Sequence, residues 1–242
     1  MGPPTAAYRS HPPGGCSGRL GAARRWPERL RHGMLMIISL LAACGSNPPA
    51  PDWQMNAKAA SERAVAAYLT GNARIDAAEQ TRARAEVART GRADLLARVE
   101  LAHCAAQVAS LAFGPCAAFE PLRADAPAAE RAYADYLAGQ LAPADAALLP
   151  EAHRAVAAQG NALAGIADPL SRLVAAGVLF ETHRAEPATI QTAIDTASAQ
   201  GWRRPLLAWL QVQLKRAEAA GVEADAQQLR RRIALVERGG AP

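Results

Sequence analysis

The chain has 242 residues, of which 27 are Lys or Arg and 22 are Asp or Glu. Six of the basic residues but only one of the acidic residues fall within residues 1–43, which leaves 21 of each sign in the remainder. A chain that is neutral after residue 43 lacks the positive excess on which nucleic-acid binding depends, so no nucleic-acid partner is expected. The 55 alanines after residue 43, with few aromatic or β-branched residues, exclude a β-rich or collagen-like fold.

An apolar run from Met34 to Ala43 follows a stretch that carries arginines. The run has roughly half of the ~20 residues that a membrane-spanning helix needs, so it predicts a signal peptide. Its end, Leu41-Ala42-Ala43-Cys44, resembles the lipobox of bacterial lipoproteins. The resemblance implies cleavage before Cys44 and acylation of its thiol. The alternative is a short buried apolar segment with an incidental cysteine.

The composition changes along the first fifty residues. Residues 1–30 are crowded with Pro, Gly and Arg, which is typical of translated upstream sequence, and we consider both Met1 and an internal start near Leu30. The expected organisation is a leader and signal peptide at 1–43, a lipidated cysteine with a Pro-rich tether at 44–52, and a single all-helical domain at 53–242.

The residue after the cysteine bears on the membrane. In lipoproteins of Gram-negative bacteria an Asp at this position commonly marks retention in the inner membrane, and here it is Gly45. The resemblance therefore implies a lipid-anchored protein of the outer membrane that faces the periplasm. Several acyl chains on one cysteine would hold it firmly, because a single chain binds membranes only marginally.

Gly and Pro divide the domain into segments of ordinary helix length. The glycines suit the ends of helices and the prolines suit their first turns. No segment has the pattern of a strand, so the predicted fold class is all-α. The expected helices are 53–70, 73–90, 92–112, 127–140, 143–158, 169–183, 187–200, 203–220 and 223–238.

The apolar faces of these helices predict how they pack. Segment 92–112 has two opposite stripes, one through Leu95 and Val99 and one through Leu101 and Val108, so we expect it to be covered on two sides. Segment 223–238 has one stripe, which predicts a terminal helix with a solvated side.

A glycine followed five residues later by an alanine resembles the turn of tetratricopeptide repeats. Gly139 with Ala144 and Gly221 with Ala226 fit this spacing. No clean 34-residue period runs through the chain. We therefore expect stacked helical hairpins, either tetratricopeptide-like or forming an irregular α-solenoid or bundle.

Cys104 and Cys116 remain once the leader and the acylated cysteine are set aside. An even pair in an oxidising periplasm favours a disulfide. The Cα atoms must then approach to about 4.4–6.8 Å, which requires the helix to end near Ser110 or the chain to turn back at Gly114-Pro115. The alternative is two small buried side chains.

The histidines do not predict a metal site. His103, His153 and His183 lie on three separate expected helices, without the paired spacing of metal ligands. No nucleophile elbow, phosphate-binding loop or dinucleotide motif is present in the sequence. The sequence therefore predicts no catalytic residues, no metal and no cofactor.

Two tryptophans and two arginines gather at one expected helix start, as Trp202, Arg203, Arg204 and Trp209. One interpretation is structural, with the tryptophans against the core and the arginines in solvent. The other is a partner-binding surface, because Trp and Arg are common anchors of interfaces.

The leading hypothesis is a membrane-anchored, non-enzymatic helical scaffold that binds a protein or another envelope component. The alternative is an envelope enzyme or a carrier of apolar ligands or lipids, with a pocket between helices. A closed pocket with converging histidines would favour the alternative, and an open groove over the C-terminal helices would favour the scaffold.

Overall fold

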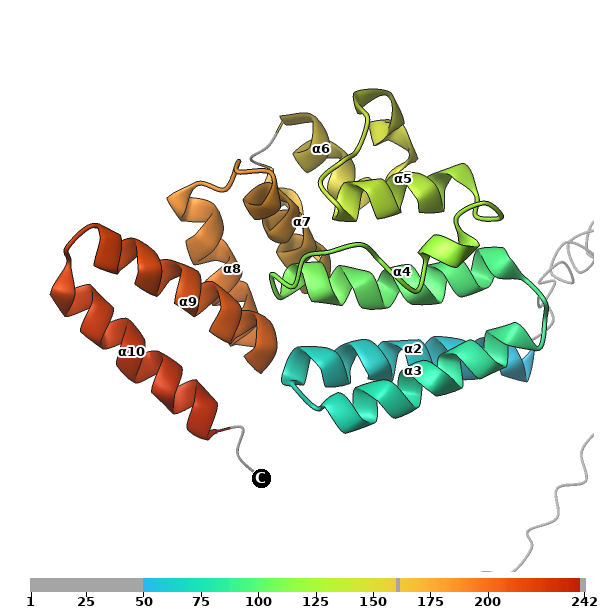
Figure 1. The fold of residues 1–242 in the computed structure, drawn as a ribbon, viewed down its shortest axis with the longest axis horizontal. Helices are drawn as coiled ribbons and strands as arrows, with labels where there is room; N and C mark the ends of the chain where they lie inside the picture. Colours follow the sequence, from blue (N-terminus) through green and yellow to red (C-terminus); the bar gives the residue numbers. More distant parts are fainter. Residues whose placement is uncertain (1–49, 160–161, 240–242) are drawn as a thin grey trace, which may run out of the picture. The chain divides into compact units, whose positions relative to one another are not determined.

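The computed structural model describes residues 50–159 and 162–239, which belong to one compact unit. This part of the chain is all-α, which confirms the predicted fold class, and contains no strand (Figure 1). In chain order the elements are α2 (Asp52–Thr70), α3 (Ala73–Ala88), α4 (Ala93–Ala109), the 3-10 helix η1 (Glu120–Leu122), α5 (Ala128–Leu137), the 3-10 helix η2 (Pro143–Leu148), α6 (Glu151–Gln159), the 3-10 helix η3 (Leu163–Gly165), α7 (Pro169–Glu181), α8 (Pro187–Gln200), α9 (Arg203–Ala219) and α10 (Glu223–Arg238).

The ends of the helices follow from local chemistry. Helix α2 ends at Gly71, whose φ of 86° is a left-handed conformation that glycine adopts without strain. The Asn72 side chain accepts a hydrogen bond from the Ile75 amide at 3.1 Å and so caps α3. Asp168 caps α7 in the same way, by accepting from the Ser171 amide at 2.7 Å.

The expected helix 143–158 is wrong, because the structure divides this segment at Pro150. Residues Pro143–Leu148 form η2, and α6 begins only at Glu151. Leu149, which precedes the proline, has a ψ of 155° and is therefore extended. A proline disfavours the helical conformation of the residue before it, and this local rule outweighs the helical pattern of the alanines around it.

Helix α4 lies at the centre of the described fold and contacts α2, α3, α5 and α7. Figure 1 shows it between the α2–α3 hairpin and α5. Val99 packs with small residues of α2 and α3, whereas Leu101 and Val108 belong to the larger core shared with α5 and α7. Val99, Leu101 and Val108 are buried and Leu95 is partly buried, so α4 is covered on two sides as expected.

Helix α7 approaches α4 very closely. A Cβ atom added at Gly177 would collide with the carbonyl oxygen of Val108, so the two backbones meet without a side chain between them. The contact explains a glycine inside a helix, where it otherwise costs about 1 kcal/mol relative to alanine.

Helices α7, α8, α9 and α10 pack in sequence, each against the next. Ala226 and Ile233 of α10 are buried, whereas Leu235 on its other side is 63% exposed. The prediction of a one-sided terminal helix is confirmed.

Only one of the two tetratricopeptide-like spacings lies in a hairpin of α-helices. Gly221 has a φ of 70° in the turn between α9 and α10, and Ala226 is fully buried against the neighbouring helix. Gly139 also turns the chain, but Ala144 falls in the 3-10 helix η2. The spacing at Gly139 therefore does not mark a repeat unit of two α-helices.

Candidate binding pocket

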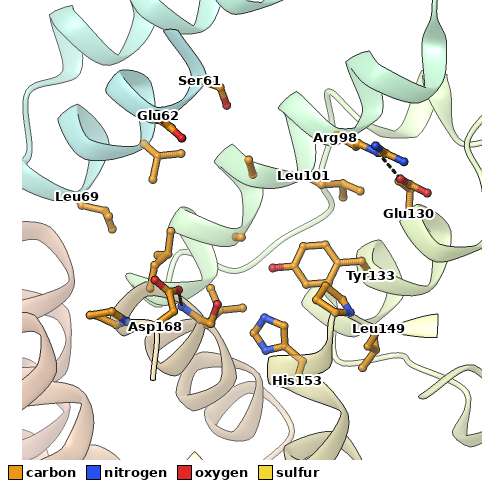
Figure 2. A pocket seen from close by; sticks show the side chains of 18 of the residues that line it. Ser61, Glu62, Leu69, Arg98, Leu101, Glu130, Tyr133, Leu149, His153 and Asp168 are labelled. Atoms are coloured by element: carbon orange, nitrogen blue, oxygen red, sulfur yellow. Dashed lines mark hydrogen bonds and ion pairs between the residues drawn. The ribbon is translucent and has the colours of Figure 1, made fainter. Parts of the chain in front are cut away.

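A pocket of about 890 Å³ opens to solvent between α2, α4, α5, α6 and the beginning of α7. Figure 2 looks into it, with Ser61, Glu62 and Leu69 of α2 on one side and Tyr133 and His153 on the other. Helices distant in sequence form its walls, because α4 contacts both α2 and α5. The pocket is thus a product of the tertiary arrangement.

The floor of the pocket is apolar. Leu69, Leu101, Leu149 and Val174 line it, and each is almost completely buried. Trp202 adds a partly buried aromatic face and packs near Leu69. Such a lining can bury a hydrocarbon surface, which is favourable by roughly 25 cal/mol per Å² of apolar area removed from water.

A polar aromatic cluster stands at the α5–α6 side of the pocket. The Tyr136 hydroxyl lies 3.4 Å from Nδ1 of His153, and the rings of Tyr133 and His153 are 5.6 Å apart. Figure 2 shows the Tyr133 side chain reaching from α5 into the pocket. The cluster offers hydrogen-bonding groups next to the apolar floor.

The ionisable groups of this cluster are neutral near pH 7. Burial lowers the pKa of His153 to about 4, against a smaller opposing effect of the Asp168 carboxylate. Burial also raises the pKa of both Tyr133 and Tyr136 above its usual range. His153 is 2% exposed, so its imidazole is an uncharged hydrogen-bonding group.

The charged residues that line the pocket have partners in the protein. Arg98 Nε donates to Glu130 Oε1 at 2.6 Å, which pairs the two charges at one end of the pocket (Figure 2). Asp168 accepts the amide of Ser171 at the start of α7, where the helix dipole favours a negative charge. Arg154 Nε donates to the Leu149 carbonyl at 2.8 Å.

The three histidines do not converge. His103 lies on another face of α4, where Nε2 is 2.9 Å from Oδ1 of Asp76 and the ring meets Tyr68 edge-on. His183 is exposed in the turn after α7. Only His153 lines the pocket, and its one side-chain hydrogen bond within the described chain is to Tyr136.

No nucleophile is activated within the described part of the pocket. Ser61 and Ser171 line it, but neither hydroxyl is hydrogen-bonded to a histidine or carboxylate there. The described residues also include no group of three or more His, Cys, Asp or Glu side chains arranged to hold a metal ion.

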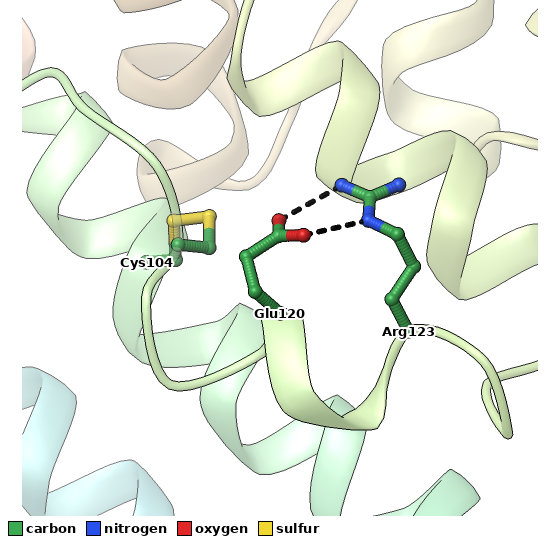
Figure 3. The surroundings of a disulfide bond; sticks show 4 residues. Cys104, Glu120 and Arg123 are labelled. Carbon is green, nitrogen blue, oxygen red and sulfur yellow. Dashed lines mark hydrogen bonds and ion pairs between the residues drawn. A yellow bond between two sulfur atoms is a disulfide. The ribbon is translucent and has the colours of Figure 1, made fainter.

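Cys104 and Cys116 form a disulfide, with their Cα atoms 5.7 Å apart (Figure 3). Helix α4 ends at Ala109, three residues before the end expected from the sequence. Leu111 and Gly114 then take φ values of 57° and 151° and return the chain toward the helix. The early end of the helix is what brings the two cysteines together.

An ion pair follows the disulfide. Arg123 donates to both carboxylate oxygens of Glu120 at 2.9 Å (Figure 3), and its Nη1 reaches Asp135 of α5 at the same distance. The disulfide and the ion pair together fix the connection that brings α5, and with it Tyr133, beside α4.

The four residues at the start of α9, for which the sequence allowed a structural or a partner-binding role, have different surroundings in the structure. Trp209 is fully buried, and its Nε1 donates to the Ala109 carbonyl at 3.1 Å, so it cannot anchor a partner. Arg204 Nε donates to the Tyr68 carbonyl at 2.8 Å, and its guanidinium lies 4.3 Å from the centre of the Tyr68 ring. The partner-binding interpretation is wrong for Trp209, and Arg204 serves an internal contact. Trp202 lines the pocket and Arg203 lies beside Gly71.

The predicted lipidation site, Cys44, lies outside the described residues. The first residue described is Ala50, within the expected Pro-rich tether. None of the described helices combines the length and apolar character needed to cross a membrane.

Searches with protein-family models, among curated proteins and among solved structures each found no match to this chain. A function for this chain is therefore argued from the residues of the pocket.

Glu130, Tyr133 and Leu149 were not predicted as site residues from the sequence. A usable signal was present, because two of the chain's four tyrosines, Tyr133 and Tyr136, lie one helical turn apart and a histidine follows in the next helical segment.

Proposed function

We propose that this protein is a lipid-anchored, non-enzymatic binding protein of the bacterial envelope that holds an apolar envelope component between its helices. The observation that carries the proposal is the apolar pocket of about 890 Å³. Small-molecule sites usually enclose about 300–1,000 Å³ and combine an apolar lining with few polar groups. The floor formed by Leu101, Leu149 and Val174, beside Tyr133 and His153, has this composition.

The anchor is the second part of the proposal. Acyl chains on Cys44 would attach the domain to the outer membrane through the Pro-rich tether, with the pocket in the periplasm. The lipobox and Gly45 support this placement. A tethered pocket would remain close to the lipids and proteins of the membrane surface.

The anchor is tested by changing Cys44→Ser. We expect the variant to leave the membrane fraction or to accumulate as an uncleaved precursor, because the acyl chains are the proposed attachment. Cell fractionation and the mass of the isolated protein measure this, and Ser46→Ala, beside the box, is the matched control. Unchanged processing and membrane attachment of Cys44→Ser would refute the lipoprotein assignment.

The pocket is tested by placing a photo-crosslinking amino acid at Ala102, which lines it, and separately at Ala208 of α9, which does not. In intact cells we expect the probe at Ala102 to capture an apolar molecule of low mass, which mass spectrometry of the purified protein detects. The probe at Ala208 should give no such adduct. Protein adducts alone at Ala102 would exclude a small ligand.

A second candidate is the scaffold, which binds a protein partner. A groove of about 710 Å³ between the end of α4 and helices α7, α8 and α9 supports it. Phe113 and Phe180 stack on its floor, and Lys215 and Arg216 line its edge. A protein adduct at Ala208 that disappears in Lys215→Glu/Arg216→Glu would favour an acidic partner there.

A further inference from the structure

We infer that the pocket binds an uncharged amphiphile, with a carbonyl or hydroxyl oxygen accepting hydrogen bonds from Tyr133 and His153 and a hydrocarbon chain lying along Leu69, Leu101 and Val174. This inference rests on the proposed function and adds the chemical class of the ligand. Three features of the pocket carry it: the direction of its hydrogen bonds, the pairing of its charges and the nature of its walls.

Two hydrogen-bonding groups at the pocket, the Tyr133 hydroxyl and Nε2 of His153, are available to a ligand. The Tyr136 hydroxyl lies 3.4 Å from Nδ1 of His153, and we assign the hydroxyl as the donor, because a phenol is a good donor and an unprotonated imidazole nitrogen a good acceptor. A neutral imidazole carries one proton, which is then on Nε2. Neither Nε2 of His153 nor the Tyr133 hydroxyl is hydrogen-bonded within the described chain. With this assignment, both can donate to a ligand that supplies an accepting oxygen.

The charges of the pocket favour an uncharged ligand. Glu130 is paired with Arg98 through Oε1, while its Oε2 is buried without a hydrogen-bond partner in the described chain, and the charge of Asp168 is stabilised at the start of α7. A ligand carboxylate near His153 would meet the field of Asp168, which also acts on the His153 imidazole. At the mouth, the exposed residues Glu62 and Arg154 carry opposite charges.

The walls favour a hydrocarbon chain over a peptide. They consist mostly of helical segments, whose backbone amides and carbonyls are bonded within each helix, together with the turn at Leu149 and Pro150 and the first turns of α5 and α7. An extended peptide would bury its own amides against Leu69, Leu101 and Val174 without partners, which costs free energy for each group. A hydrocarbon chain has no such groups to satisfy.

The experiment uses the full-length lipidated protein in isolated membranes and three photoreactive probes of equal chain length: hexadecanol, palmitic acid and hexadecane, each with a diazirine in the chain. We expect the wild type to be labelled by the alcohol about fivefold more than by the acid or the alkane, because only the alcohol combines an accepting oxygen with no charge. Labelled peptides should come from α2, α4 and α7.

Two variants separate the inference from the proposed function. Tyr133→Phe removes one oxygen and should lower alcohol labelling about fivefold without changing alkane labelling, whereas the matched control Tyr68→Phe, outside the pocket, should change neither. Ala102→Trp fills the pocket and should abolish labelling by every probe.

The inference is overturned if the acid is preferred, or if alcohol and alkane label equally and Tyr133→Phe has no effect. In either case, loss of labelling in Ala102→Trp would still support the pocket. Undiminished labelling of Ala102→Trp would overturn both proposals.

Discussion

The two sides of α4 are held together in different ways. Toward α2 and α3 most of the packed side chains are small, with Ala60, Ala83 and Val87 among them, although Tyr68 and Leu69 at the end of α2 pack against Ala106. The buried Glu100 accepts hydrogen bonds from Arg84 and Gln80 on this side. Toward α5, α7 and α9 they are large and apolar, including Trp209 and Phe119. The first side combines small side chains with polar pairing, whereas the second depends on buried volume, apart from the close backbone contact of Gly177 with Val108. The pocket lies where these two kinds of packing meet, with its α2 wall on one side and its α5–α7 wall on the other.

The largest expected effect comes from the side of large residues. Trp209→Ala should lower the free energy of unfolding by about 3–5 kcal/mol, because it leaves a cavity and removes the donor to the Ala109 carbonyl. Val87→Ala, equally buried but in the α2–α3 packing, should cost only about 1–2 kcal/mol. Urea denaturation of both variants measures the difference, and equal losses would contradict the contrast between the two sides.

The disulfide belongs to the same large core. Cys104→Ser/Cys116→Ser should lower stability by about 2–4 kcal/mol, because the bond closes a loop of 12 residues in the unfolded chain. Denaturation with and without reductant measures this, and reduction should bring the wild type down to the stability of the double variant. Free thiols in denatured, unreduced wild-type protein would show that the bond does not form.

The pH dependence of stability tests whether His153, at the α5–α6 side of the pocket, is buried in its neutral form. Burial lowers the pKa of His153 from 6.5 to about 4, so between these pH values the unfolded chain binds a proton that the folded chain does not. Stability should therefore be complete above pH 6.5 and fall as the pH drops to 4, by at most about 3 kcal/mol.

Thermal melting across this pH range measures the contribution of His153. In His153→Gln the stability should fall less between pH 6.5 and 4 than in the wild type, whereas His183→Gln, at an exposed site, should show the same fall as the wild type. An identical slope in His153→Gln and the wild type would show that the imidazole is not buried in its neutral form.

The smallest expected effect lies where the two sides are joined. Arg204→Ala should cost about 1–2 kcal/mol, because it removes a hydrogen bond to Tyr68 and the contact with its ring. Arg203→Ala, at the next position, should stay within about 0.5 kcal/mol. Melting of both variants compares them, and equal losses would mean that the contact of Arg204 with α2 contributes no stability.

Local sequence signals predicted most of the helices. The expected ends of α2, α7, α8, α9 and α10 agree with the structure to within two residues. For α2, α8 and α9 the reason is that Gly71, Gly201 and Gly221 stop helices by their own backbone preferences. The same local reasoning failed at Pro150, where one helix was expected across a proline, and at Ala109, where α4 ends early. In both places a turn competes with a run of residues that favours a helix.

The sequence by itself determined the all-α class, the double coverage of α4 and the single buried face of α10, since each depends on residues within one helix. Only the tertiary structure decided where the pocket lies and whether each aromatic residue lines the pocket or is buried in the core. Trp202 and Trp209 are seven positions apart on the sequence, yet one lines the pocket and the other is sealed in the core. Tyr133, His153 and Leu101 meet because α4, α5 and α6 are brought together by the disulfide, by the chain reversal after Ala109 and by burial of the large core. Such a site depends on distances between helices, and helical periodicity carries information only about the faces of each helix.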